Sequence, residues 1–425
     1  MAVKHELENS LLLDDDGRAR TGTLWSCIAH IITAVIGSGV LSLAWSVAQL
    51  GWIAGPVAML CFSIVTYFSV VLLSDCYRYP DPVTGTRNYS YMDVLGQTQT
   101  WLCGLFQYLF MYGICTAYVI TTRHAIRRSN CYHESGHNAK CEYEDTPYMM
   151  IFGAHKMAFS LAAIMSFAYS LTGFGLGLAT VIGRNGMIKG SLTGAPAATR
   201  AKKLWLVFEA LGDIAYAYPY ALILLEIQKL LNEGYFEVTS TENKTMKKAS
   251  MVAIFLTTLF YLLCGCFGYA AFGNNTPGNL LTGLGFYEPY WLIGFANACI
   301  VLHLVGGYQL FSQPVFTFVE RWSSKKFPRS GFLNNFYSIK LHCCFFPHLS
   351  FQDLFSNCIC FVNNSDCTVF PYFNQVLGLL GAFNFWPLAI YFPVEMYFVR
   401  NKVEAWTRNG LFSEHLASFA FLYQL

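Results

Sequence analysis

Three residues whose types disfavour a continuous helix, Gly37, Ser38 and Gly39, stand near the middle of an apolar run, in the stretch TAVIGSGVLSLAW. Two glycines around a serine weaken a helix. Inside a membrane a helix is interrupted only where the freed backbone groups face protein or a wet cavity. The stretch therefore predicts a broken helix or, if the helix continues, a packing seam of small residues.

A break at this position would offer backbone groups of both polarities to a ligand. The N-terminus of the second half-helix presents unpaired N–H groups and the positive end of a dipole to a carboxylate. The carbonyl groups freed at the end of the first half can accept hydrogen bonds from an ammonium group. Because an amino acid zwitterion carries both of these charges, the break is a candidate site for binding one.

A second interruption is predicted at residues 211–220, LGDIAYAYPY. Pro219 has no backbone N–H to donate. Asp213 is an acid at the start of an apolar run, and an ionisable group inside a span is costly and usually functional. The alternative is that Asp213 caps the helix at the membrane interface. Two interrupted spans, one in each half of the chain, are typical of transporters built from inverted repeats.

Two histidines also lie within apolar runs, His30 in the first and His303 in the stretch IVLHLVGGYQ. Imidazole titrates near neutral pH, so both residues are candidates for a proton route. The alternative is that each is a buried residue with a purely structural hydrogen bond. No histidine-rich metal box and no phosphate-binding glycine loop occurs, and Cys264 and Cys266 lack a second ligand pair. We therefore predict no catalytic residue, no metal and no cofactor.

The composition requires these residues to sit on membrane-spanning helices. The 425 residues are 55% hydrophobic and only 12% charged, about half the charged share of a soluble domain. At about 20 residues a span, the chain accommodates about nine or ten transmembrane helices. The formal net charge of +2 gives no basic field that would attract nucleic acid.

The spans are expected in residues 23–400, between a cytosolic tail at 1–22 and a C-terminal segment at 401–425. The tail is polar and acidic and has no apolar core, so it is not a cleavable signal peptide. With the loops assigned by the topology of the family that the chain resembles (below), Lys and Arg are in excess on the side of the tail, which favours a cytosolic N-terminus. The expected spans lie near 23–50, 52–77, 101–125, 147–182, 204–228, 249–273, 291–319, 350–371 and 373–399.

Most of the 15 cysteines lie inside apolar runs, where cysteine is a small hydrophobe. Cys131 and Cys141 differ, because they bracket the polar stretch YHESGHNAK between two expected spans. They are candidates for a disulfide if that loop is extracellular. Two free thiols are the alternative.

Long stretches of the chain resemble the plant amino acid permeases of the amino acid/auxin permease family. The resemblance covers most of residues 17–335 and 370–400, and its stretches include DGRARTGTLWSCIAHIITAVIGSGVLSLAWSVAQLGWIAGP, ALGDIAYAYPYALILLEIQ, ANACIVLHLVGGYQLFSQPVF and FNQVLGLLGAFNFWPLAIYFPVEMY. These matches are too long and too specific to arise by chance.

The resemblance implies an all-α polytopic protein with the leucine-transporter-type 5+5 inverted-repeat fold, in which helices 1 and 6 are broken. It implies proton-coupled symport of neutral and some acidic amino acids across the plasma membrane, with free amino acids, protons and membrane lipid as partners. Under it Gly37, Ser38 and Gly39 receive the substrate carboxylate. The pocket is lined by the sixth-helix break, and His30, Asp213 and His303 match titratable positions. That second break consists of Ile214, Ala215, Tyr216 and Ala217.

Three departures from the family pattern lead to an alternative function. The run 147–182 is too short for the two helices that the family has there, and a single crossing would keep the two breaks apart. Residues 340–369 do not resemble the ninth helix of the family, and 401–425 is too short and polar for the last one. The alternative is therefore a permease variant that inserts in the membrane and transports nothing.

Overall fold

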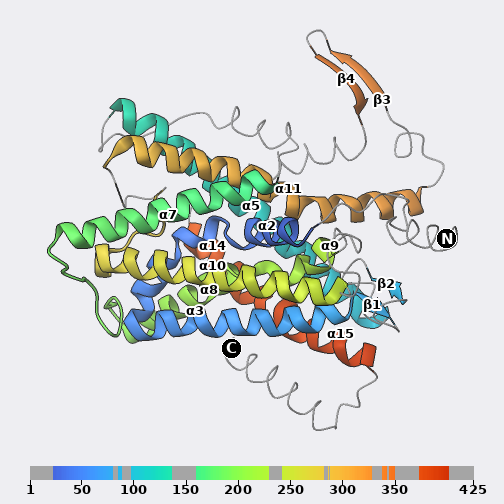
Figure 1. Cartoon of the computed structure of the whole chain (residues 1–425), viewed down its shortest axis with the longest axis horizontal. Coiled ribbons are helices and arrows are strands. Elements are labelled where there is room, and N and C mark those ends of the chain that lie inside the picture. Colours follow the sequence, from blue (N-terminus) through green and yellow to red (C-terminus); the bar gives the residue numbers. More distant parts are fainter. Residues whose placement is uncertain are drawn as a thin grey trace, which may run out of the picture.

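Long apolar helices dominate the computed structural model of the chain (Figure 1). The structure describes residues 23–79, 85–88, 97–135, 159–228, 242–281, 286, 288–327, 337–341, 344–349 and 373–401. Seven of its helices are long and apolar enough to cross a membrane, in Leu43–Asp75, Thr100–Ile126, Leu161–Gly183, Arg200–Gln228, Asn243–Asn275, Tyr290–Lys326 and Asn374–Arg400. An eighth apolar helix is shorter, at Leu24–Val35.

The elements follow one another along the chain and pack mostly lengthwise. They are α2 (Leu24–Val35), η1 (Ser38–Leu41), α3 (Leu43–Asp75), β1 (Arg78–Tyr79), β2 (Thr86–Arg87), α5 (Gln97–Ser135), α7 (Phe159–Gly183), α8 (Arg200–Tyr216), η2 (Pro219–Ile223), α9 (Leu224–Gln228), α10 (Glu242–Phe272), η3 (Gly273–Asn275), α11 (Tyr290–Lys326), β3 (Tyr337–Leu341), β4 (Cys344–Leu349), α14 (Phe373–Phe385), the π-helical η4 (Trp386–Tyr391) and α15 (Phe392–Asn401).

The outer faces of the bundle are as apolar as a lipid-facing surface should be. Phe68, Phe255 and Trp291 are exposed, whereas Asp213, His303 and several hydroxyl side chains are fully buried. A water-soluble bundle shows the opposite arrangement of polar and apolar residues. Asp213, His303 and the buried hydroxyl groups therefore lie inside the bundle, away from its apolar outer faces.

Helix α3 contains the end of the span predicted at 23–50 and most of the one predicted at 52–77, separated by a sharp bend at Gly51. Gly51 adopts φ 89° and ψ 177°, and a side chain there would overlap the carbonyl oxygen of Leu192. Glycine alone adopts this conformation at little cost. Thus α2, η1 and the first turns of α3 form one interrupted helix, and the rest of α3 forms the next helix in the bundle.

The direction of the later helices decides whether the two predicted breaks can meet. Along α7, Tyr169 lies beside Ile36 and Gly173 beside Leu41, so α7 runs parallel to the first interrupted helix. Along α8 the order is reversed, from Lys203 near Gln49 to Ala217 near Gly39. The directions of α7 and α8 therefore bring the two breaks together. The described part of the run 147–182 holds one helix, α7, and residues 147–158 lie outside the described chain.

Two small antiparallel hairpins accompany the helices. Strand β1 pairs with β2 at one end of the bundle, and β3 pairs with β4, which lies apart from the helices in Figure 1. The sequence did not predict the second hairpin. The span expected near 350–371 lies outside the described residues, so the structure gives no account of it.

The loop between α7 and α8 joins the ends of four elements at the other end of the bundle. The backbone N–H of Ala195 donates to Ala48 O at 2.7 Å, and the backbone N–H of Lys189 donates to Ala270 O at 3.0 Å. Lys203 Nζ donates to Gln49 O at 2.6 Å and to Ala195 O at 2.8 Å. The ammonium group therefore holds the loop against the bend in α3.

Replacing Lys203 with methionine is expected to loosen this loop. Hydrogen bonds from a charged donor contribute about 1.5–3 kcal/mol when the acceptors are shielded from water. The backbone amide of Ala195 should then exchange with solvent about tenfold faster or more, as measured by hydrogen exchange and mass spectrometry. Lys202→Met, at the neighbouring exposed position, is the matched control and should leave the exchange rate unchanged. Equal rates in the two variants would contradict the assignment.

Candidate functional site

The first interruption lies where the glycines predict it. Helix α2 ends at Val35, Gly37 adopts φ −105° and ψ −147°, and a new helical segment begins at Ser38. A Cβ atom on Gly37 would lie 2.6 Å from Tyr118 Oη, so the backbone can approach α5 only because the side chain is absent. The alternative of an unbroken helix with a packing seam is therefore wrong.

The second interruption follows Tyr216. The chain leaves helical geometry at Tyr218, with φ −115° and ψ 54°, and η2 begins at Pro219. Proline fits the first position of a helix because its missing N–H would have no partner there. Ile214, Ala215, Tyr216 and Ala217, predicted as this break, form the last turn of α8 and its C-terminal cap, and all four are buried.

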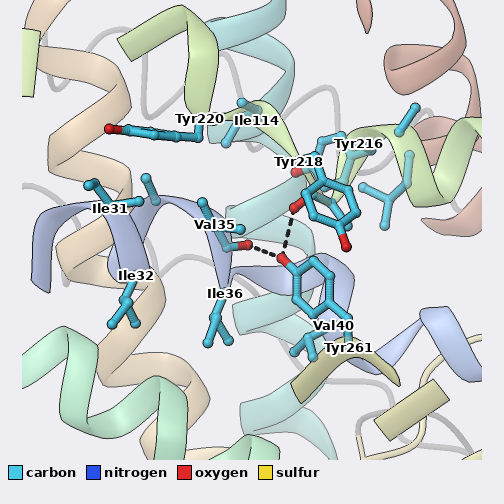
Figure 2. Packing of buried hydrophobic residues seen from close by; sticks show 14 of the residues in the cluster. Ile31, Ile32, Val35, Ile36, Val40, Ile114, Tyr216, Tyr218, Tyr220 and Tyr261 are labelled. Carbon is cyan, nitrogen blue, oxygen red and sulfur yellow. Dashed lines mark hydrogen bonds between the residues drawn. The ribbon is translucent and has the colours of Figure 1, made fainter. Parts of the chain in front are cut away.

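The two interruptions touch each other at the centre of the bundle. A Cβ atom on Gly39 would lie 3.4 Å from Ala217 Cβ, which is van der Waals contact, so the two interruptions are direct neighbours. The hydroxyl group of Tyr261, on α10, donates to Val35 O and to Ala217 O, the latter at 2.7 Å. Figure 2 shows Tyr261 between the end of α2 and the aromatic residues of the second break. One side chain thus binds the carbonyl ends of both broken helices.

A second tyrosine serves the first interruption from another helix. Tyr169 Oη on α7 donates to Ile36 O at 2.9 Å and to Gly37 O at 3.0 Å. The last carbonyls of a helix have no partner within it. Each hydroxyl has a single proton for two acceptors, so the carbonyls of Ile36, Gly37 and Ala217 retain capacity for further donors.

Replacing Tyr261 with phenylalanine is expected to destabilise the protein, because it removes the hydroxyl group and keeps the aromatic ring. Val35 O and Ala217 O would lose a shared donor in a buried environment, at a cost of about 1–3 kcal/mol. Thermal melting of the purified protein in detergent would show this as a lower Tm. Tyr218→Phe is the control, since the Tyr218 hydroxyl makes one longer bond, 3.3 Å to Thr258 Oγ1. A Tm for Tyr261→Phe equal to that of the control would contradict the bridging role.

Asp213 lies beside the interruptions rather than at a membrane interface. It is fully buried inside α8, with Ser42 Oγ donating to Oδ1 at 2.9 Å and Ser46 Oγ donating to Oδ2 at 2.5 Å. The interpretation of Asp213 as an interfacial helix cap is therefore wrong. The residue instead connects the second interrupted helix to the half-helix that follows the first break.

The two candidate histidines differ in their relation to the breaks. His303 is fully buried, with Nδ1 2.9 Å from Ala162 O and its ring 5.6 Å from that of Tyr169. The Tyr169 hydroxyl bonds the backbone of the first break, so the side chain of Tyr169 lies between His303 and the break. His30 lies in the middle of α2, is only half-buried, and has Nδ1 2.6 Å from Ser26 O in its own helix.

The disulfide prediction falls largely outside the described structure. Cys131 belongs to α5, where its side chain is not described, and Cys141 lies outside the described residues. Within the part of the chain that the structure describes, no group of three or more potential metal-ligating side chains is present.

Sequence reasoning missed four residues that define the site: Ser42, Ser46, Tyr169 and Tyr261. The serines did leave a signal, because they stand four residues apart on one face of the half-helix and are polar in an apolar run. The tyrosines left none, since a tyrosine in an apolar span usually packs without a special partner.

Comparisons with known proteins agree on one family. The family model described as "Transmembrane amino acid transporter protein" matches residues 20–424. The chain is 49% identical to "Probable amino acid permease 7" of Arabidopsis thaliana, over 97% of this chain and 92% of the relative. It is 46% identical to "Amino acid permease 6" of the same plant, over 99% and 92%. "Lysine histidine transporter-like 1" is more distant, 26% identical over 93% and 85%.

Proposed function

The chain belongs to the transmembrane amino acid transporter family, and from this premise we propose that it is a proton-coupled symporter. Its substrates are neutral amino acids, with acidic ones as a further class, and it moves them across the plasma membrane by alternating access. It is a multi-pass membrane protein, and we propose the leucine-transporter-type 5+5 inverted-repeat fold with the N-terminus in the cytosol.

The contact between the two helix interruptions is the observation that supports transport best. The N-terminal N–H groups of the segment that begins at Ser38 suit a carboxylate. Val35 O also accepts the backbone N–H of Gly37 at 2.8 Å, but the carbonyls of Ile36, Gly37 and Ala217 depend on tyrosine protons that they share with other acceptors, so an ammonium group, with three donors of its own, suits them. In this proposal the last turn of α8 lines the pocket around the substrate side chain.

Asp213 is the residue of this site that we propose to carry the proton. It is buried, and two hydroxyl groups are its hydrogen-bond partners in the described chain. A buried carboxylate without a cation is costly when ionised, and a proton removes that cost. His303 is the second candidate because it contacts Tyr169, and His30 is the third because its ring lies farther from the break.

Amino-acid-evoked current in oocytes that express this chain tests the proposal. External pH of about 5.5 and about 7.5 would be compared, since a carboxylate or imidazole carrier changes its proton occupancy over this range. Symport predicts inward currents that grow at the lower pH. Surface labelling in the same cells is the control for expression. A labelled chain at the surface that gives no current at either pH would overturn the proposal.

A second function, an inserted but transport-inactive permease variant, is favoured by one observation. Strands β3 (Tyr337–Leu341) and β4 (Cys344–Leu349) pair with each other, and they overlap the stretch 340–369 that does not resemble the ninth helix of the family. The oocyte experiment separates the two functions, because only the inactive variant would reach the surface without carrying current.

A further inference from the structure

We propose that Ser42 is the positioning residue that transmits the protonation of Asp213 to the backbone of the first helix break. This inference rests on the proposed function and adds to it the residue through which proton and amino acid influence each other. The Ser42 hydroxyl group has one proton and two possible acceptors.

Ser42 Oγ is within hydrogen-bond distance of two different oxygens. It lies 2.8 Å from Gly39 O, in the same turn, and 2.9 Å from Asp213 Oδ1, on α8. A hydroxyl group donates one proton and accepts through its lone pairs, so it serves one of these acceptors at a time. Which one it serves depends on whether Asp213 is ionised.

The ionised carboxylate accepts only, and hydrogen bonds to a charged acceptor are the stronger ones. Ser42 then donates to Asp213, and Gly39 O keeps only the backbone N–H of Ser42, at 3.1 Å. A protonated Oδ1 instead donates to Ser42 Oγ, and the Ser42 proton turns to Gly39 O. Protonation thus adds a hydrogen bond to the turn that follows the first break.

That turn carries the N–H groups proposed to bind the substrate carboxylate. A turn with a second hydrogen bond to Gly39 O holds those groups more firmly in place. Proton and amino acid then favour the same arrangement, and each raises the affinity of the other by the same factor. Ser46 differs, because its hydroxyl meets Asp213 Oδ2 without a bond to the break.

The charged surroundings of Asp213 in the described chain are sparse, so its own proton dominates the local charge. The neighbouring segments of η1, α14 and the first turns of α3 contribute no titratable side chain. On α8 itself, Glu209 lies one turn before Asp213 and Tyr216 about one turn after it. Lys203 is the nearest cation along α8, and it binds Gln49 O and Ala195 O.

Binding of a radiolabelled neutral amino acid to the purified full-length protein tests the relay at about pH 5.5 and about pH 7.5. For the unmodified chain we expect a half-saturating concentration at least about fivefold lower at the acidic pH. The ratio of the half-saturating concentration at about pH 7.5 to that at about pH 5.5 should fall to near one in Ser42→Ala. In Ser42→Thr, which keeps the hydroxyl, the ratio should be as large as in the unmodified chain. Ser46→Ala should keep the ratio, but the change should occur about one pH unit higher, since one donor to the ionised form is lost.

Ser74→Ala is the matched control, because the Ser74 hydroxyl bonds only Val70 O within α3. Its pH ratio should equal that of the unmodified chain, and Tm values would show that each variant is folded. A Ser42→Ala ratio as large as that of the unmodified chain would overturn the relay and leave direct charge repulsion as the coupling. Loss of the ratio in Ser46→Ala as well would also overturn it. Folded, unmodified protein that binds no amino acid at either pH would instead overturn the proposed function.

Discussion

Asp213→Asn is expected to abolish the proton dependence of amino-acid-evoked current and to reduce the current at acidic pH about tenfold or more, which corresponds to about 1.4 kcal/mol. Asparagine has nearly the same shape as aspartate and can bond Ser42 and Ser46, but it takes up no proton in this pH range. The site would therefore be held in one state at every pH. Current recorded from oocytes between about pH 5 and 8 would measure the effect.

Asp75→Asn provides the control for this prediction. Asp75 lies at the end of α3, pairs with Lys247 Nζ at 2.6 Å, and is partly exposed. Ion pairs of this kind contribute about 0–1 kcal/mol, so the current should change by no more than about twofold. If Asp213→Asn retained a steep pH dependence with normal surface expression, the proton would bind elsewhere, and His303 would be the next residue to replace.

Gly381→Ala is expected to prevent normal folding, because α8 and α14 pack backbone against backbone. A methyl group on Gly381 would overlap Gly212 O, and one on Gly212 would overlap Gly378 O. Backbone atoms cannot turn away as a side chain can, so the helices would have to separate. We expect a cost of about 2 kcal/mol or more, measured as a lower Tm and a smaller monodisperse fraction in detergent.

Gly175→Ala is the matched substitution for this comparison. Gly175 also lies inside a helix, α7, but a methyl group there meets no atom within 4 Å. Alanine is the better helix former, by up to about 1 kcal/mol, so this variant should be at least as stable as the parent. Similar losses of Tm in the two variants would show that the α8–α14 contact is not what makes Gly381 necessary.

Local chemistry made the two interruptions predictable. Gly37 and Gly39 weaken a helix through their conformational freedom, and Pro219 has no backbone N–H to donate. Each break can therefore be predicted from the few residues that form it. The buried position of Asp213 was one of two alternatives that the sequence left open. Only its partners on α3 decide between them.

What the sequence could not supply are contacts between residues far apart in the chain. Nothing near Gly212 indicates that it must fit against Gly378, and nothing in α10 marks Tyr261 as the donor to both breaks. Such pairings depend on how the helices are arranged, and a hydrophobic pattern does not encode a particular partner. The loop bound by Lys203 is a further example, because its bonds reach the ends of helices that the loop itself does not join.

The backbone contact between α8 and α14 also limits how the molecule can deform. Two helices whose glycines touch cannot rotate past each other, since any other residue brought into the contact would collide. We expect them to move as one rigid body. The seam between α8 and the first interrupted helix is different, because it is crossed by side-chain hydrogen bonds from Ser42 and Ser46, and the Ser42 hydroxyl has a second acceptor in Gly39 O. For the transport proposed above, we therefore expect the site to open between α3 and α8, with α14 moving together with the second broken helix.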